Sequence, residues 1–391
     1  MSYSLSESNA AAVDVVVVGG GVIGLAVAWR ACQRGLTVTV LERGQPGSGT
    51  SRVAAGMLGP IAEASTGEEP LLALGLASAR IYPSFVSDLV ASSGIQDVGY
   101  LRCGTMLVAR DGDEAEALVR ELELRLRLGL RVGRLRASEA RRREPALAPS
   151  LRLALDVPDD HAIDPRKLTA ALATSVRRAG GQVRNRAPVA ELVLGGDRVR
   201  GVVLADGTRV SGDQVVIAAG AWSTEVAGIP PHARVRISPV KGQILRLHDP
   251  AGPGLLSCVV RMTGGYVVPR GDGRYVIGGT MEERGFDTTV TAGAVFELLR
   301  EAGELIPGVS ELVVDELSAG LRPGTADNLP VIGPGGVEGL HWTTGHRRNG
   351  ILLAPITAAL IVDMLAGEPP AELAGPFAPS RFASPPVGST R

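Results

Sequence analysis

The chain has little of several features that mark particular classes of protein. Its 40 lysines and arginines are balanced by 41 aspartates and glutamates, which leaves a formal charge of −1. That balance excludes a nucleic-acid binder that works through bulk positive charge. Aromatic residues make up only 3% of the chain, which argues against a base-stacking platform or a carbohydrate groove.

Cysteines and long apolar runs are scarce as well. The three cysteines, Cys32, Cys103 and Cys258, lie far apart, which argues against a disulfide framework or a zinc site. The longest uncharged apolar run, Val15 to Trp29, is shorter than the ~20 residues of a membrane span. The first residues lack the basic segment of a signal peptide. We therefore expect a cytoplasmic protein with no metal site, no membrane segment and no nucleic-acid partner.

Glycine, in contrast, is abundant, with 51 of 391 residues, about twice its usual share. A chain of this composition makes many tight turns and close backbone approaches, as nucleotide-binding folds do. Hydrophobic residues make up 45%, enough for a globular core, and the length predicts two domains or one large one.

Valine-rich strand patterns alternate with helical patterns along the chain. Strands are predicted over 14–18, 37–41, 189–194, 199–204, 215–218, 243–247, 265–269, 274–278 and 311–316. Helices are predicted over 22–34, 68–90, 113–130, 136–143, 165–179, 291–304 and 350–365. A strand–helix–strand unit opens the chain, whereas later stretches are strand-rich without alternating helices.

This order predicts a mixed α/β (α+β) fold, with a discontinuous Rossmann-like domain and a second, mostly antiparallel β-sheet domain. We assign 13–60, 150–228 and 318–367 to the first domain, 61–149 and 229–317 to the second, and 1–12 and 368–391 to flexible tails. The C-terminal tail is predicted from prolines among small polar residues, which have little to bury.

The strongest local signal is a glycine-rich turn between a buried strand and an apolar helix. Gly19 permits the tight turn, Gly21 lets the backbone approach a pyrophosphate, and Gly24 lets the helix pack closely. The pyrophosphate then meets the N-terminus of the helix. Glu42, at the end of the second strand, can accept hydrogen bonds from ribose hydroxyls. The pattern predicts a dinucleotide site.

The glycine motif does not by itself separate NAD from FAD. The loop GSGTSRVAAGMLGP (47–60) follows directly and contains mostly small residues. Such a loop suits close passage along a long cofactor, with Thr50 and Ser51 as hydrogen-bonding groups. The alternative is an ordinary mobile loop.

Several motifs, taken together, resemble those of a known family. They are TSRVAAGMLGP (50–60), VVIAAGAWS (215–223), GGYVVPR (264–270), GLRPGTADNLPVIG (320–333) and TGHRRNGILLAP (344–355). With the opening segment, they resemble the D-amino-acid-oxidase-like flavoenzymes, most specifically the glycine oxidase branch that serves thiamine biosynthesis. The resemblance runs from about residue 13 to 367.

The resemblance implies FAD bound without a covalent link. With the glycine turn, the predicted cofactor contacts are Gly19, Gly21, Val22, Ile23, Gly24, Glu42, Arg43, Thr50, Ser51, Ala55, Gly56, Met57, Val189, His346, Arg347, Arg348, Asn349, Gly350, Ile351 and Leu352. His346 is assigned to packing against the flavin rather than to proton transfer.

An amino-acid substrate presents a carboxylate, for which a fixed guanidinium is the natural partner. Arg322, beside Pro323-Gly324, is the candidate, although a surface arginine is the plain alternative. The resemblance supports Arg322 and adds Tyr266, Met281 and Arg348 as substrate-binding residues. Without it, Tyr266 and Met281 would be read as packing residues.

The resemblance further implies oxidative deamination of glycine, and of sarcosine and small D-amino acids. Hydride would pass to flavin N5, and O2 would reoxidise the flavin and give hydrogen peroxide. No residue is predicted as a catalytic acid or base, because hydride transfer from a neutral amine needs none. The imine would supply the thiazole moiety of thiamine, with hand-off to a thiazole synthase, and the family suggests a homo-oligomer, a tetramer. The alternatives are a D-amino-acid or sarcosine-type dehydrogenase with another electron acceptor, or a non-catalytic flavin-binding module.

Two features stand apart from these motifs. Gly264 takes a position where some family members carry histidine, and Arg347 is more basic than expected there. The arginine-rich stretch 118–143 interleaves arginines with leucines and glutamates, and we interpret it as a solvated helix face rather than a nucleic-acid site.

Overall fold

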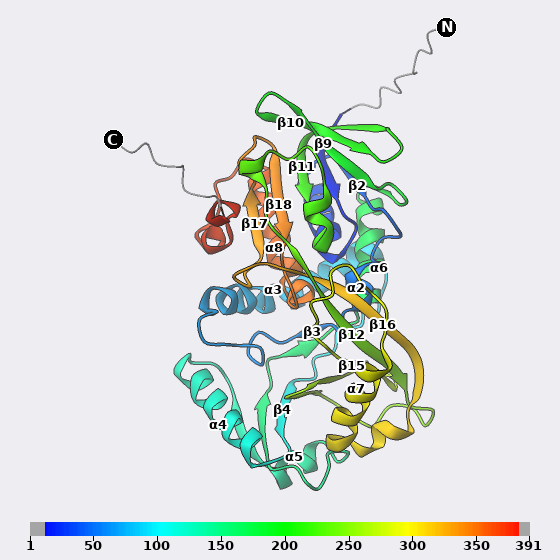
Figure 1. Cartoon of the computed structure of the whole chain (residues 1–391), viewed down its shortest axis with the longest axis vertical. Helices are drawn as coiled ribbons and strands as arrows, with labels where there is room; N and C mark the ends of the chain where they lie inside the picture. Colours follow the sequence, from blue (N-terminus) through cyan, green and yellow to red (C-terminus); the bar gives the residue numbers. More distant parts are fainter. Residues whose placement is uncertain (1–11, 383–391) are drawn as a thin grey trace.

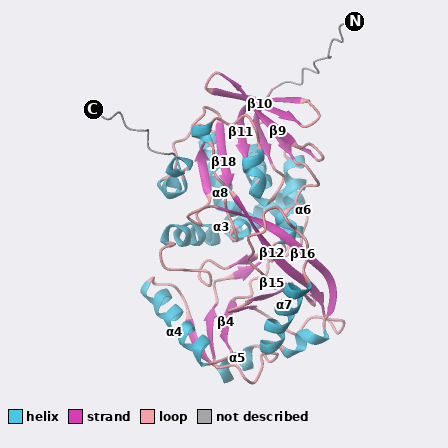
Figure 2. Cartoon of the chain, viewed as in Figure 1, coloured by secondary structure: helices cyan, strands magenta, loops and turns pink. Residues whose placement is uncertain are grey.

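Two eight-stranded β-sheets organise the protein, as shown by a computed structural model that describes residues 12–382 (Figure 1). A third sheet has only two strands, β3 (Met57–Leu58) and β7 (His161–Ala162). The long strands β12 (Ser238–His248) and β16 (Val313–Gly324) pair with each other and run from the middle of the molecule into the second sheet. Helices gather beside both sheets (Figure 2). This arrangement confirms the predicted mixed α/β fold.

The first sheet contains the glycine-rich turn. Its strands run in the order β17-β18-β11-β1-β2-β8, extended by β10 and β9. Their bounds are β1 (Val13–Val18), β2 (Val38–Leu41), β8 (Gln182–Arg184), β9 (Val189–Gly195), β10 (Arg198–Leu204), β11 (Arg209–Ile217), β17 (Val331–Pro334) and β18 (Leu340–Thr344). The pairs from β8 through β18 are parallel, and the valines at the centre of β1 are fully buried. Burial on both faces explains the uninterrupted valine run.

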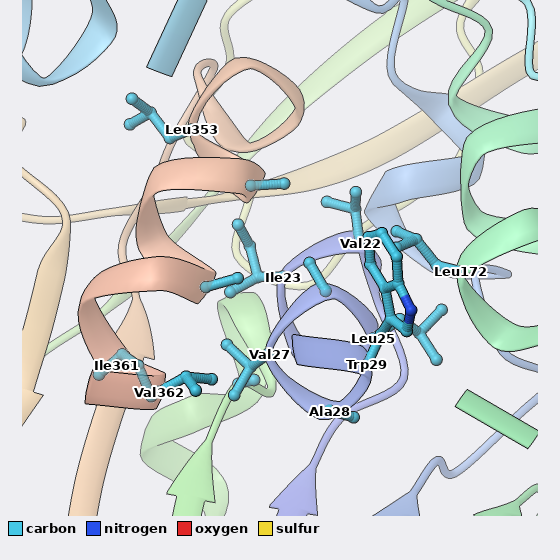
Figure 3. Close-up of a cluster of buried hydrophobic side chains, with 14 of the residues drawn as sticks. Val22, Ile23, Leu25, Val27, Ala28, Trp29, Leu172, Leu353, Ile361 and Val362 are labelled. Atoms are coloured by element: carbon cyan, nitrogen blue, oxygen red, sulfur yellow. The ribbon is translucent and has the colours of Figure 1, made fainter. Parts of the chain in front are cut away.

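Helices cover one face of this sheet. They are α1 (Val22–Gln33), α3 (Glu69–Ser93), α6 (Pro165–Arg178) and α8 (Gly350–Leu365). In Figure 3, Val27 of α1 points toward Ile361 and Val362 of α8, while Leu25 and Trp29 lie near Leu172 of α6. Each valine, leucine and isoleucine of this cluster contributes roughly 1.5–3 kcal/mol through its burial from water. The cluster holds α1, and therefore the turn before it, in a fixed position.

The second sheet is antiparallel except where β13 pairs with β4. Its order is β16-β12-β15-β14-β13-β4-β6-β5. The remaining bounds are β4 (Thr105–Ala109), β5 (Gly133–Arg136), β6 (Leu153–Val157), β13 (Val259–Met262), β14 (Gly265–Pro269) and β15 (Arg274–Gly278). The helices α4 (Gly112–Arg127), α5 (Ala137–Arg143) and α7 (Ala292–Leu305) accompany it.

The structure moves two of the expected boundaries. Strand β6 belongs to the second sheet, although 150–228 was assigned to the first domain, and β16 stays in the second sheet to Gly324. Residues 1–11 and 383–391, in the two expected tails, lie outside the described residues. The expectation of a tail is wrong for 372–382, which forms the 3-10 helices η4 (Glu372–Phe377) and η5 (Pro379–Phe382). They are fixed because Phe377 is fully buried.

His341, in β18, makes the stability of the fold depend on pH. Its side chain is 7% exposed, and burial lowers its pKa from 6.5 to about 4. The folded state therefore favours the neutral imidazole, so this contribution is complete above pH 6.5 and is lost as the pH falls toward 4. Between pH 7.5 and 5.5 we expect the free energy of unfolding to fall by about 1.4 kcal/mol through this group.

Urea unfolding of the wild type and of His341→Gln at both pH values measures this contribution. The variant should lose less stability on acidification, since glutamine does not titrate there. Equal losses in the two proteins would show that His341 ionises as readily in the folded as in the unfolded chain.

Candidate active site

A cavity of about 750 Å³ is lined by residues from both sheets. The glycine-rich turn and the loop 49–57 border one part of it, and the strands β14 and β16 border another. We call these the nucleotide end and the substrate end. The C-terminal segment 346–351 also lines the cavity.

The turn at the nucleotide end depends on two glycines packed against backbone. Gly19 has a φ of +108°, and a Cβ there would lie 2.5 Å from the carbonyl oxygen of Ala218. A Cβ on Gly24 would lie 2.0 Å from the carbonyl oxygen of Gly19. Gly21 differs, because a Cβ there would meet only the Ser51 hydroxyl, at 3.3 Å. The backbone at Gly21 is therefore open toward the cavity.

Side chains at the nucleotide end are fixed by backbone amides. The two carboxylate oxygens of Glu42 accept hydrogen bonds from the N–H groups of Gly20 and Gly44, both at 2.8 Å. The Ser51 hydroxyl accepts one from Val22 N–H at 3.0 Å. The Thr50 hydroxyl donates to the carbonyl of Leu321 at 2.6 Å, which ties α2 (Thr50–Val53) to β16.

Arg43 and Trp222 form part of the cavity wall and stack on each other. The guanidinium of Arg43 lies 3.5 Å from the centre of the Trp222 ring, and Trp222 stacks on Phe286 with ring centres 5.8 Å apart. Arg43 was predicted, whereas Trp222 was not. A tryptophan within the VVIAAGAWS motif of a chain so poor in aromatics was the available signal.

The C-terminal segment places a neutral histidine at the cavity. His346 is buried, with Nε2 3.0 Å from the Thr357 hydroxyl oxygen, and burial lowers its pKa to about 3. Its charge state suits packing rather than proton exchange with a substrate. Arg347 has a φ of +44° and donates to Asn328 and, at 3.8 Å, to the sulfur of Met281.

Arg322, at the substrate end, is held by carbonyl oxygens. Its Nη1 donates to the carbonyls of Thr280 at 2.8 Å and Lys241 at 3.4 Å. The guanidinium lies over Gly242, where a Cβ would be 2.2 Å from Nη1. Tyr266 lies beside it, and burial raises the pKa of the phenol while the nearby Arg322 charge opposes this shift.

The other two predicted substrate residues have different surroundings. Met281 lines the cavity but is 56% exposed, so it lies at the mouth. Arg348 lies 2.9 Å from a carboxylate oxygen of Glu63, measured from Nε. The second oxygen of Glu63 accepts from Nε of Arg261 at 3.0 Å. Sequence reasoning missed Glu63 and Arg261, which both line the cavity.

The cavity brings together all the predicted substrate residues and most of the predicted cofactor residues. Among the described residues, Gly24 and Leu352 are predicted contacts that do not line it. Gly24 packs instead against the turn. Leu352 is buried toward α3, where its carbonyl accepts from the Ser78 hydroxyl at 2.6 Å. The helix α8 begins at Gly350, and its rotation turns Leu352 away from the cavity.

A strand–turn–helix dinucleotide site that shares a cavity with an arginine on a β-strand is typical of dinucleotide-dependent oxidoreductases. Residues 14–364 match the family described as FAD dependent oxidoreductase, and the chain belongs to this family. It is therefore an FAD-dependent oxidoreductase, as the sequence predicted.

Individual relatives give a more specific comparison than the family as a whole. The chain is 35% identical over 374 residues to a glycine oxidase of Geobacillus kaustophilus, covering 94% of this chain and 97% of the relative. The crystal structure of glycine oxidase from that organism aligns with a TM-score of 0.88 and 34% identity, over 96% of this chain and all of the other. A bifunctional protein ThiO/ThiG of Synechocystis is 34% identical over 97% of this chain, which spans 56% of that protein.

The residues that line the cavity are suited to bind FAD. The open backbone at Gly21 leaves room for a pyrophosphate beside the start of α1. The carboxylate of Glu42, held by backbone amides, is oriented for ribose hydroxyls, and Val189 lines the same end. The segment 346–351 would border the flavin ring.

Within residues 12–382, no helix has the length and apolar character that a bilayer span requires.

Proposed function

We propose that the protein catalyses the oxidative deamination of glycine in this cavity, with O2 as the electron acceptor. The overall reaction converts glycine, O2 and water into glyoxylate, ammonia and hydrogen peroxide. The observation that carries this proposal is the guanidinium of Arg322, which within residues 12–382 donates to carbonyl oxygens rather than to carboxylates. The names of the relatives, glycine oxidase among them, support the same substrate.

Arg322 would bind the substrate carboxylate through charge-assisted hydrogen bonds. The Tyr266 hydroxyl, beside Arg322, would donate to the same carboxylate. Bound FAD supplies the acceptor for the two electrons and the hydrogen that leave the substrate carbon. The protein then contributes position rather than acid–base chemistry, since the amine binds as the free base and the buried His346 stays neutral.

Besides glycine, we include sarcosine and small D-amino acids as substrates. The imine formed from glycine would supply the thiazole part of thiamine, by hand-off to a thiazole synthase. The name ThiO/ThiG of the bifunctional relatives supports this link. We further propose a cytoplasmic homo-oligomer, a tetramer as the family suggests.

A peroxide assay in air tests the proposal, with glycine, sarcosine, D-alanine and D-proline offered in parallel to the purified FAD-loaded protein. Peroxide formed with glycine is expected, together with equal amounts of ammonia. Substrate consumption that needs an artificial acceptor and yields no peroxide in air would instead identify the dehydrogenase alternative. No turnover of any of the four amines would favour a flavin-binding module.

A further inference from the structure

Glu63 lies between two arginines at the substrate end. One carboxylate oxygen is 2.9 Å from Nε of Arg348 and the other is 3.0 Å from Nε of Arg261. The side chain of Glu63 is 18% exposed, and all three residues line the cavity. One negative charge is therefore shared by two cations, partly shielded from water.

This pairing separates the arginines of the substrate end into two kinds. Arg348 and Arg261 already face a carboxylate, whereas Arg322 donates to the carbonyls of Thr280 and Lys241. Arg347, beside Met281 at the mouth, is of the second kind, because it donates to Asn328 and to the Met281 sulfur. A carboxylate that enters the cavity meets attraction at Arg322. Near Arg348 and Arg261, the Glu63 charge cancels part of the attraction of the two arginines, and a partly desolvated site strengthens this effect.

Hydrogen bonds to both the N–H and the carbonyl groups hold the two residues that precede Glu63. The carboxylate of Asp160, which is fully buried, accepts hydrogen bonds from the N–H groups of Ile61 and Ala62 at 3.2 and 2.6 Å. The guanidinium of Arg125 donates to the carbonyls of the same two residues at 2.9 and 2.7 Å. All four polar groups of these residues are thereby used.

Arg125 also corrects the interpretation of the stretch 118–143. It belongs to α4, where a solvated face was expected, yet its side chain is only 1% exposed. Burying a guanidinium is costly without partners, and its partners are this loop and Glu121, at 3.1 Å. The hydrogen bonds of Arg125 and Asp160 therefore fix the backbone that carries Glu63 at the cavity.

We propose that Glu63 determines substrate specificity by restricting the site to amino acids with a single acidic group. Its charge is paired with Arg348 and Arg261, so that a second carboxylate of a substrate meets the Glu63 charge beside two arginines that are already partly neutralised. Specificity of this kind comes from repulsion of the wrong substrate as much as from attraction of the right one. The inference rests on the proposed function, because it assumes that Arg322 anchors the first carboxylate.

The direct test is Glu63→Gln, which keeps the shape and removes the charge. The kcat/KM for iminodiacetate and for D-aspartate, each divided by that for glycine, should rise at least tenfold, mainly through a lower KM for the diacids. Glu63→Asp, which keeps the charge, should raise these ratios far less. Glu304→Gln is the matched control, because Glu304 also lies between two arginines, 2.7 Å from Arg110 and 2.9 Å from Arg300, but does not line the cavity. It should leave the ratios unchanged.

A second variant gives the opposite sign and serves if Glu63→Gln loads FAD poorly. Arg261→Met leaves Glu63 with one cation, so the diacid ratios should fall below those of the wild type. Unchanged ratios in a folded, FAD-loaded Glu63→Gln, or an equal rise in Glu304→Gln, would overturn the proposal.

A binding measurement separates failure of this inference from failure of the proposed function. Acetate and malonate carry one and two carboxylates and are not oxidised as amines, and their binding can be followed by the shift they cause in the visible spectrum of bound FAD. Glu63→Gln should lower the Kd of malonate relative to that of acetate at least tenfold, whether or not glycine is turned over. An unchanged ratio of the two Kd values would contradict the role of Glu63.

Discussion

Replacing Arg322 with alanine is expected to raise the KM for glycine by about 100-fold or more, while FAD stays bound. The lost interaction is a charge-assisted pair with the substrate carboxylate, at the upper end of the ~1.5–3 kcal/mol that such hydrogen bonds contribute. Arg322 sits on β16, pinned by two carbonyls and covering Gly242. Steady-state kinetics and the visible spectrum of the purified variant measure both effects.

Arg274→Ala is the control for this substitution. Arg274 lies on β15 of the same sheet but pairs at the surface with Asp272 and does not line the cavity. Its loss should leave the KM within a small factor of the wild type. A normal KM in a folded Arg322→Ala would show that another group binds the carboxylate, with Arg348 the first to examine.

Replacing Gly21 with valine is expected to yield a folded protein that has lost its FAD. Gly21 has extended backbone angles, a φ of −75° and a ψ of 179°, which a β-branched residue adopts readily. A Cβ there would meet only the Ser51 hydroxyl within 4 Å, so the new side chain would project where the pyrophosphate must approach. The flavin content per chain, with far-UV circular dichroism as a check of folding, measures the outcome.

Substitutions of two other glycines serve as controls for this result. Gly293→Val adds the same side chain at a position where a Cβ meets nothing within 4 Å, and it should keep both fold and flavin. Gly24→Val should disrupt folding itself, because a Cβ there lies 2.0 Å from the carbonyl oxygen of Gly19. A yellow, fully loaded Gly21→Val would refute the phosphate-binding assignment of this turn.

The parts of the site that sequence could predict are those encoded by adjacent residues. The turn at Gly19, the acid at Glu42 and the start of α8 at Gly350 each follow from a local pattern of strand, loop and helix. The motif that contains Arg322 could also be recognised, because its residues are adjacent in the sequence. The structure brings these local elements to one cavity, while their individual roles stay predictions.

The parts that sequence missed depend on partners far along the chain. Glu63 has no local motif, and its role follows from Arg261, which lies 198 positions away. Arg125 looks like any arginine of an exposed helix until the loop at Ile61 packs against it. Strands β4 and β6 were missed because β4 is uniformly buried and neither alternates cleanly, so periodicity gives no signal there.

Anaerobic mixing with glycine is the measurement that tests the central claim most directly. The visible absorbance of the bound FAD should fall on addition of glycine to the wild type, and should recover when air is admitted, with peroxide formed. Arg322→Ala should show no comparable fall at the same glycine concentration. A spectrum that glycine leaves unchanged, in a protein whose flavin dithionite still reduces, would contradict glycine oxidation at this site.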